Sequence, residues 1–394
     1  MTVLSFIKSV IRRISKVLLL DFEIPLLYRA SSRKAINENK VVFIEVRHNY
    51  ITDSFSLLYN RLINDGEHEV KACFLRNVEL HGMAYRKRVY EMVKEIADAK
   101  YIFINDGCNA VAAVPLRKES RLIQTWHACG AFKKFGCSTA KLKFGESSLE
   151  QRLHPNYKNI SLVSVSAPDV VWAYEEAMNI QQKGVVKPLG VSRTDVFYDS
   201  EFINSAKAEI AEKYPKTKGK KLILYAPTYR GRVAEAAPAD KLDIKQFYER
   251  LGGEYALLIK QHPLVKNRPP VPEEYSGFAF DVADSVSIDS LLCAADICIT
   301  DYSSVIFEYS IFEKPMIFFV YDIEDYYDWR GFYFSFDELA PGLQAKTNEE
   351  MLDYIEHLDE RFDKQAVKDF RNRFMSACDG KSTERILSYI FSNK

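Results

Sequence analysis

Two absences narrow the class of protein that this 394-residue sequence can encode. No apolar run reaches the roughly 18 residues that a membrane-crossing helix needs, so the sequence predicts no transmembrane helix. The seven cysteines are odd in number and form no Cys-x-x-Cys pair, which argues against a disulfide framework and against a zinc site. We therefore expect reduced thiols in a cytoplasmic protein.

An excess of charge of either sign is also missing, since 54 Lys and Arg residues balance 54 Asp and Glu residues. We accordingly expect no nucleic-acid partner. The sequence contains no internal repeat, no low-complexity tract, no Walker Gly-Lys-Ser motif and no nucleophile elbow, and no carboxylate cluster has metal-ligand spacing. What is present is a globular composition, with 47% hydrophobic residues, at a length that predicts two domains.

The first 20 residues predict a basic amphipathic helix with an apolar face and a cationic face. A signal peptide is disfavoured because charges interrupt the apolar region and no small-residue cleavage site follows. We expect residues 1–22 to contact an anionic membrane surface, and packing on the protein's own domain is the alternative. The positions that define the two faces are apolar Val3, Phe6, Ile7, Val10, Ile11, Ile14, Val17 and Leu18, and basic Lys8, Arg12, Arg13 and Lys16.

Strand-like and helix-like segments alternate through the rest of the chain, which predicts an α/β fold with parallel, doubly wound sheets. We place an N-terminal domain at residues 23–198 and a C-terminal domain at residues 199–394, with the last helices packing back on the N-terminal domain. The expected strands are residues 41–46, 70–75, 100–105, 121–126, 162–166, 221–225, 257–260, 296–300 and 316–321.

The segment 295–321 contains one complete crossover unit. A strand leads into the polar turn Asp-Tyr-Ser-Ser at 301–304, a helix is expected over 305–313, and Lys-Pro at 314–315 ends that helix before the next strand. A serine at a helix start commonly caps the helix with its own oxygen. Alternatively, two hydroxyls and the free N–H groups of the helix can hold an anion. From this segment alone, capping is the favoured interpretation.

Several polar residues are expected at the carboxyl ends of strands, where open α/β sheets bind their ligands. They suit transfer from a nucleotide-diphosphate donor, because Arg and a helix start can hold a diphosphate and a neutral His can remove a proton from an attacking hydroxyl. Either histidine could be this base, and the other could donate a hydrogen bond to a phosphate oxygen. The residues are His127, Arg193, Arg230, His262, Ser303 and Ser304.

Six ordered motifs resemble the CDP-glycerol glycerophosphotransferase family, which builds wall teichoic acid and related polymers. They are QTWHACGAFKKFG (124–136), LGVSRTD (189–195), ILYAPTYRG (223–231), LLIKQHPL (257–264), the segment 295–322 and RGFYF (330–334). The resemblance implies a GT-B fold, with two Rossmann-like domains whose parallel sheets face a central cleft. It also implies transfer of glycerol phosphate from CDP-glycerol, with CMP leaving, to a hydroxyl of an undecaprenyl-diphosphate-linked saccharide.

The same resemblance implies peripheral attachment to the cytoplasmic face of the cell membrane and a specific set of site residues. His127 and His262 match the essential histidines of the family, and the first is expected to be the base. No tightly held metal or other cofactor is expected, a loosely bound Mg²⁺ on the diphosphate is left open, and so is a homo-oligomer. The implied substrate-binding residues are Arg193, Asp195, Thr228, Arg230, Asp301, Ser303, Ser304 and Arg330.

Two departures from the family pattern bear on specificity. The sequence WHACGAFK stands where many members have WHGTPLK, and it is more similar to the priming enzymes that add the first glycerol phosphate. Arg-His-Asn-Tyr at 47–50 replaces an early glycine-rich loop, which we expect to face the acceptor. The alternatives are a CDP-ribitol ribitolphosphotransferase, a GT-B glycosyltransferase that uses a nucleotide sugar, and a membrane-bound scaffold on an inactive transferase fold.

Overall fold

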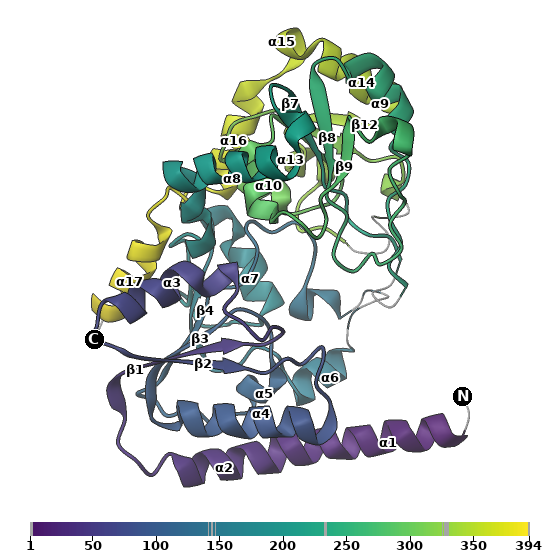
Figure 1. Ribbon diagram of the computed structural model, residues 1–394. Helices are drawn as coiled ribbons and strands as arrows, with labels where there is room; N and C mark the ends of the chain where they lie inside the picture. Colours follow the sequence, from purple (N-terminus) through teal and green to yellow (C-terminus); the bar gives the residue numbers. More distant parts are fainter. Residues whose placement is uncertain are drawn as a thin grey trace. The chain divides into compact units, whose positions relative to one another are not determined.

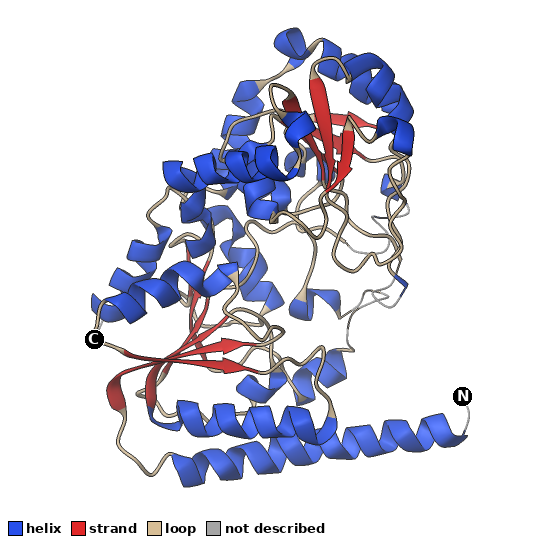
Figure 2. Cartoon of the chain, viewed as in Figure 1, coloured by secondary structure: helices blue, strands red, loops and turns tan. Residues whose placement is uncertain are grey.

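A computed structural model of the chain describes residues 3–140, 142, 145, 147–231, 235–324, 326 and 331–392 (Figures 1 and 2). The chain divides into two compact units. Unit 1 comprises Met1–Ala128, Phe135–Arg193 and Lys381–Lys394, and unit 2 comprises Cys129–Lys134 and Thr194–Gly380.

The sheet of unit 1 has six parallel strands in the order β2-β1-β3-β4-β5-β6. In the neighbouring strands β1 and β3, residues 41–44 and 101–104 are apolar and buried, as expected for a sheet covered on both faces. The strands are β1 (Asn37–Glu45), β2 (Glu69–Phe74), β3 (Ala99–Ile104), β4 (Arg121–Gln124), β5 (Ile160–Ser164) and β6 (Val186–Lys187).

Helices cover both faces of this sheet, because successive side chains of β1 point to opposite sides. Val42 and Ile44 pack in the core under α2 and α4, whereas Val41 and Phe43 pack in the core under α3 and α17. Figure 1 shows these two helix pairs on opposite sides of the strands. The helices are α2 (Ile24–Ser31), α3 (Asp53–Asn64), α4 (Gly82–Glu95), α5 (Asn109–Ala112), α6 (Ser148–Leu153), α7 (Val171–Ala177) and α17 (Ser382–Ser392).

The N-terminal helix is longer than expected. Helix α1 (Val3–Val17) continues through the π-helical turn η1 (Leu18–Glu23) into α2. Leu19 and Leu20 are buried in the core of unit 1, whereas Ile11 and Ile14 are 60% and 55% exposed. The first part of the helix therefore presents apolar side chains to solvent, and its continuation packs on its own unit. The side chains of Val3 to Ile7 lie outside the described part of the structure.

The sheet of unit 2 also has six parallel strands, in the order β12-β11-β10-β7-β8-β9. The three-residue strands β9 and β12 were not expected, because such short runs show no periodicity. The strands are β7 (Lys221–Tyr225), β8 (Tyr255–Ile259), β9 (Ala279–Asp281), β10 (Ile297–Thr300), β11 (Met316–Phe319) and β12 (Leu343–Ala345).

The helices of unit 2 include three from the C-terminal region, α14 to α16, while α17 belongs to unit 1. Among the described residues, no helix combines the length and the apolar character that crossing a membrane requires. The helices are α8 (Ser200–Lys213), α9 (Ile244–Leu251), α10 (Ile288–Ala294), α11 (Val305–Ser310), α13 (Phe336–Leu339), α14 (Asn348–Glu356), α15 (Leu358–Arg361) and α16 (Lys364–Phe374).

The predicted crossover at 295–321 is confirmed, since β10 and β11 pair in parallel around α11. The helix is shorter than predicted, however, and ends at Ser310 instead of 313. Beyond it the backbone bonds tighten to a three-residue spacing, and Glu313 adopts a φ of 50°. The helical conformation is disfavoured for Lys314 because Pro315 follows it, so the chain leaves the helix early.

Candidate active site

His127 follows β4 at the carboxyl edge of the unit 1 sheet and is exposed. The preceding residue, Trp126, is buried and has a φ of 58°, a conformation that non-glycine residues adopt at a cost of about 1–3 kcal/mol. The indole stacks on the His127 ring with centroids 4.4 Å apart, and on Phe135 at 4.7 Å. Its backbone N–H donates to Gln124 Oε1 at 2.9 Å. These contacts hold a strained turn that directs the imidazole outward.

The ring nitrogens of His127 have different environments. Nδ1 lies 3.0 Å from the carbonyl oxygen of Asn105. A carbonyl oxygen can only accept a hydrogen bond, so Nδ1 carries the proton and donates it. In the neutral ring, Nε2 therefore has the lone pair. This is the arrangement that a general base requires.

Asn105 is itself held by a buried carboxylate. Glu45 ends β1, Asn105 follows β3, and these neighbouring parallel strands bring the two residues to the same edge. Asn105 Nδ2 donates to Glu45 Oε2 at 2.9 Å. Thr52 donates to Glu45 Oε1 from its backbone N–H at 2.7 Å and from its hydroxyl at 2.6 Å. The polar contacts of His127 thus continue into the interior of unit 1.

The loop at 47–50, expected to face the acceptor, lies at this same edge. Arg47 forms an ion pair with Asp106, which also accepts a hydrogen bond from the Gly107 N–H at 2.7 Å. His48 and Tyr50 are exposed, with ring centroids 5.3 Å apart. The loop therefore combines a cation that is held by an ion pair, Arg47, with two exposed rings.

Arg193 and Asp195 belong to different units although only Thr194 lies between them. Both lie in the 3-10 turn η5 (Ser192–Tyr198), and the division between the units falls after Arg193. Arg193 Nη1 donates to the carbonyl oxygen of His127 at 3.3 Å. This contact joins Arg193 to the backbone of the candidate base, and a role for Asp195 stays a prediction.

Thr228, Arg230 and Asp301 come together at the carboxyl edge of the unit 2 sheet. Thr228 follows β7 and Asp301 follows β10, which are adjacent strands. Asp301 is 1% exposed and accepts hydrogen bonds from the Thr228 N–H at 2.8 Å and hydroxyl at 3.0 Å. It also accepts one from the Tyr302 N–H at 2.6 Å. Asp301 is therefore the centre of this turn.

The guanidinium of Arg230 is directed at carboxylates. Nη1 donates to Asp301 at 2.8 Å, and Nε and Nη2 donate to Asp322 at 2.6 and 3.1 Å. Burial opposes the charge of Arg230, but Asp301 and Asp322 outweigh burial and raise the pKa of Arg230. The guanidinium also lies 5.4 and 5.3 Å from the rings of Tyr302 and Tyr326. Arg230 therefore links Asp301 and Asp322 at this edge, and direct binding of a diphosphate by Arg230 stays a prediction.

Ser303 and Ser304 follow Asp301 and Tyr302 and are half-buried. The Ser303 hydroxyl accepts from the Val305 N–H at 3.4 Å, a weak form of the expected cap. Ser304 occupies the N-cap position of α11, but its side chain makes no cap hydrogen bond. One of the two hydroxyls thus has a capping contact and the other does not.

His262 follows β8, and its Nδ1 accepts a hydrogen bond, whereas Nδ1 of His127 donates one. The backbone N–H of Leu264 donates to Nδ1 of His262 at 3.2 Å, so Nδ1 has the lone pair. In the neutral ring, Nε2 therefore carries a proton that can be donated. The ring lies 4.9 Å from that of Tyr229, between Thr228 and Arg230 in sequence. This histidine is arranged as a hydrogen-bond donor.

Two of the sequence motifs, 124–136 and 330–334, pair with each other within unit 2. Lys133 forms an antiparallel bridge with Phe332, and the Lys134 N–H donates to the Gly331 carbonyl at 3.0 Å. Gly130 has a φ of 60°, and a Cβ there would lie 2.3 Å from Phe307 on α11. The segment that follows His127 is therefore anchored against α11. Arg330 lies outside the described residues.

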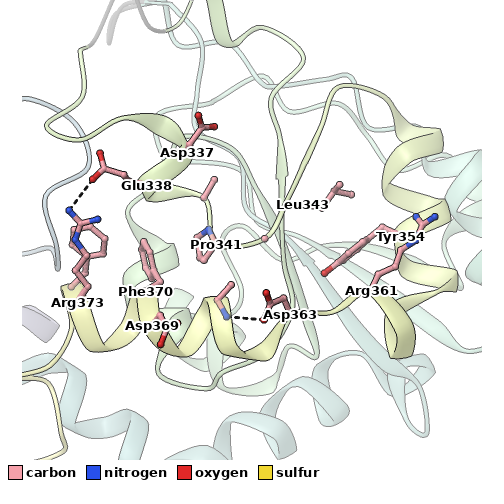
Figure 3. A pocket seen from close by; sticks show the side chains of 14 residues that line it. Asp337, Glu338, Pro341, Leu343, Tyr354, Arg361, Asp363, Asp369, Phe370 and Arg373 are labelled. Carbon is pink, nitrogen blue, oxygen red and sulfur yellow. Dashed lines mark hydrogen bonds and ion pairs between the residues drawn. The ribbon is translucent and has the colours of Figure 1, made fainter.

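A separate cavity of about 570 Å³ lies in unit 2 against α13 and α16 (Figure 3). The lining residues include Arg361 and Asp363, and Arg373 donates to Glu338 at 3.0 Å at its edge. No predicted site residue that the structure describes lines this cavity.

Four functional candidates were missed from the sequence: Glu45, Asn105, Tyr302 and Asp322. The signal for the first two was weak but present, since each is a polar residue that ends a run of buried apolar residues. Asp322 likewise follows β11. A search for polar residues at every strand end would have included Glu45, Asn105 and Asp322.

The two parallel α/β units place the protein in the GT-B class. Solved structures of the wall teichoic acid polymerase TagF share this fold, including a histidine-to-asparagine variant soaked with CDPG. That structure matches with a TM-score of 0.77 and 23% identity, over 100% of this chain and 98% of that chain. The predicted fold class is confirmed.

The sequence comparisons define the family within this class. The model of CDP-Glycerol:Poly(glycerophosphate) glycerophosphotransferase matches residues 26–392. The chain belongs to this family, as its motifs predicted. It is 34% identical over 363 residues to the teichoic acid ribitol-phosphate primase of Bacillus spizizenii, covering 91% of this chain and 92% of the primase.

Two further relatives differ in length and in the polyol of their names. The teichoic acid poly(ribitol-phosphate) polymerase of Bacillus spizizenii is 35% identical over 357 residues, and the match covers 90% of this chain but 56% of the polymerase. The teichoic acid glycerol-phosphate primase of Bacillus subtilis is 29% identical over 304 residues, with 77% and 75% covered. The chain thus spans most of the primases and about half of the polymerase.

Proposed function

We propose that this protein transfers a polyol phosphate from a CDP-polyol to a hydroxyl of a lipid-linked saccharide acceptor, with release of CMP. The acceptor oxygen attacks the phosphorus that carries the polyol. The bond from that phosphorus to the bridging oxygen breaks, and CMP leaves with that oxygen and its electron pair. The hydroxyl proton passes to a base. Family membership supports this reaction class.

The observation that carries the proposal is the hydrogen bond between His127 Nδ1 and the Asn105 carbonyl at 3.0 Å. It leaves an exposed Nε2 lone pair to take the acceptor proton. When Nε2 is protonated, the Nδ1–H still has its acceptor, so the imidazolium that forms remains hydrogen-bonded. We assign His127 as the general base.

His262 has the complementary role in this proposal. Its Nδ1 already accepts from the Leu264 N–H, so Nε2–H is the group that can donate to a phosphate oxygen. Ser303 and Ser304 supply two further hydroxyls, and Arg230 holds the Thr228–Asp301 turn in shape. We propose that these residues bind the donor diphosphate. No resident cofactor is included; activity that falls with EDTA and returns with Mg²⁺ would add a loosely bound cation.

For the donor, we propose CDP-ribitol first and CDP-glycerol, the expectation from the sequence motifs, second. The support is that the ribitol-phosphate primase is 34% identical over 91% of this chain, whereas the glycerol-phosphate primase is 29% identical over 77%. The two substrates differ only in the length of the polyol, so motifs that bind phosphate and cytidine do not separate them.

Purified protein incubated with a lipid-linked teichoic acid linkage unit and one donor at a time tests the proposal. We expect CMP release with CDP-ribitol to exceed that with CDP-glycerol, and no turnover of UDP-sugars. A preference for CDP-glycerol would restore the expectation from the motifs. Turnover of a UDP-sugar alone would identify a glycosyltransferase, and no turnover of any donor by the folded protein would favour the inactive scaffold.

We also propose that α1 lies on an anionic membrane surface at the cytoplasmic face. The support is its exposed apolar residues, among them Ile11 and Ile14, together with exposed cations such as Arg12. An Ile11→Glu/Ile14→Glu variant should lose co-flotation with anionic liposomes, whereas Val78→Glu, at an equally exposed position, should retain it. Unchanged flotation of the first variant would refute this role of α1.

A further inference from the structure

Glu45 is a buried carboxylate held by neutral hydrogen-bond donors. It is 0% exposed, and no Lys, Arg or His among the described residues forms an ion pair with it. Burying an ionised carboxylate is costly unless hydrogen bonds replace its water. Thr52 N–H, the Thr52 hydroxyl and Asn105 Nδ2 provide three such bonds at 2.6–2.9 Å. Both carboxylate oxygens are therefore engaged.

The hydroxyl of Thr52 could cap helix α3, but it does not do so. Thr52 occupies the N-cap position of α3, where a threonine side chain commonly accepts from the helix backbone. No such cap bond forms, and the hydroxyl instead donates to Glu45. Loss of a cap typically costs about 0.5–2 kcal/mol. The fold thus gives up a local helix cap in favour of the carboxylate at this edge.

Asn105 links this carboxylate to the candidate base. Its side chain donates to Glu45, and its backbone carbonyl accepts from His127 Nδ1. Asn105 Nδ2 also lies 3.2 Å from the Thr52 hydroxyl oxygen, so the amide is fixed on two sides. An amide fixed in this way also fixes the direction of the adjoining carbonyl. Its position decides which nitrogen of His127 carries the proton.

We propose that Glu45 is a positioning residue for the general base, acting through Asn105 to keep the lone pair of His127 on Nε2. This inference rests on the proposed role of His127. During transfer, the acceptor proton moves to Nε2, Nδ1–H stays on the Asn105 carbonyl, and Glu45 keeps its charge. The carboxylate favours the imidazolium by holding the Asn105 side chain, and with it the backbone carbonyl that accepts from Nδ1–H, in place. It touches neither substrate nor the reacting atoms.

Other charged groups adjoin His127 and stay unchanged in the test. Arg47 and Asp106 pair with each other on the neighbouring strand ends, and Arg193 on η5 donates to the His127 carbonyl. Glu38 is an exposed residue on the same strand as Glu45, and its partner is Lys100 at 3.1 Å. Glu38→Gln therefore removes a negative charge from β1 without touching the site and is the matched control.

The kinetic test compares Glu45→Gln with Glu38→Gln, using CMP release from the CDP-polyol. A glutamine places an NH₂ group against donors, so Asn105 loses its acceptor. We expect kcat to fall by about 10²-fold, the usual effect of slight misplacement of a catalytic group, with KM for the donor unchanged. The acid limb of the kcat/KM profile should shift to lower pH, because the imidazolium is less favoured. Glu38→Gln should match the wild type.

A second arm separates positioning from general damage. In a His127→Ala background, Glu45→Gln should cause no further loss of kcat, because both changes disable the same base. A loss of equal size in both backgrounds, or a wild-type kcat and pH profile in Glu45→Gln, would overturn the proposal. If Glu45→Gln does not fold, Thr52→Val removes one bond to the carboxylate and should lower kcat several-fold.

A third arm does not depend on turnover. Nitrogen chemical shifts of the histidine rings report which nitrogen is protonated, and the His127 signals are assigned by their absence from His127→Ala. Wild-type His127 should be protonated on Nδ1, and Glu45→Gln should show a mixture of both tautomers. An unchanged tautomer would overturn the role of Glu45 even with an inactive preparation. Inactive wild-type protein that shows the expected tautomers would refute the proposed function instead.

Discussion

Two buried carboxylates, Glu45 in unit 1 and Asp301 in unit 2, are held in opposite ways. At the edge of unit 1, Glu45 is buried with no cationic partner among the described residues, and neutral donors connect it to His127. At the edge of unit 2, Arg230 is half-buried between Asp301 and Asp322. The first arrangement leaves the lone pair of His127 Nε2 available. In the second, the guanidinium of Arg230 and the carboxylates of Asp301 and Asp322 bind one another. A base needs a free acceptor, whereas a phosphate-binding turn needs a rigid backbone.

The largest expected effect comes from replacing each of the two histidines with a residue that can donate a hydrogen bond but cannot take a proton. Glutamine can place an N–H near the position of Nε2 but cannot take a proton. His127→Gln should therefore lower kcat by about 10²–10⁴-fold, the range of general base catalysis. His262→Gln keeps a donor and should lower kcat less than His262→Ala does. Steady-state CMP release measures all three, and equal losses in His127→Gln and His262→Gln would remove the distinction between the edges.

The next effect concerns the cation that pairs with the buried Asp301 of unit 2. Arg230→Met leaves Asp301, which is 1% exposed, and Asp322 without their cation. Removing one partner of a buried pair lowers the free energy of unfolding by about 3–5 kcal/mol. Arg250→Met is the matched control, because Arg250 pairs with Glu349 and Glu356 at the surface and should lose about 1 kcal/mol or less. Urea unfolding measures both, and similar losses would show that burial of Arg230 contributes nothing.

The smallest effect belongs to a half-exposed pair at the surface, Lys16 on α1 with Glu150 on α6. The hydrogen bond from Lys16 lowers the pKa of Glu150 below its ordinary value of 4.5. A depressed carboxyl pKa stabilises the fold above the unfolded value, and this stabilisation is lost as pH falls through the folded pKa.

Near neutral pH, Lys16→Met should therefore lower the free energy of unfolding by about a few tenths of a kcal/mol, as expected for a surface pair. A slightly lower thermal midpoint measures this loss. The difference from the wild type should vanish in acid, once Glu150 is protonated. A difference that persists in acid would assign the contact to packing of the Lys16 chain and not to its charge.

The predicted fold depended on patterns that act over short distances. The runs at 41–46 and 221–225 formed β1 and β7 because apolar residues of strand type at those positions must be buried whatever follows. Strands alternating with helices then implied parallel sheets, and both sheets are parallel. The short strands β9 and β12 escaped prediction because three residues show no period.

The candidate site was predicted in part, for a related reason. Positions after strands located His127, Arg230 and His262, since carboxyl ends of parallel strands meet at one edge, whereas Thr228 and Asp301 came from the family resemblance. The contact partners were not predictable in the same way. Asp322 is 92 residues from Arg230, so no local pattern connects them. Strand order and register alone decide that β7 and β11, on either side of β10, end close enough for this pair to form.

The amino-acid sequence by itself determined the family, the parallel α/β class and the two histidines at strand ends. Only the tertiary structure decided which nitrogen of each neutral histidine carries the proton, because that depends on the Asn105 carbonyl for His127 and the Leu264 N–H for His262. It also showed that the Arg230 fork is directed at carboxylates. A side chain's chemistry belongs to its residue type, whereas its protonation and its partners depend on neighbours that folding brings together.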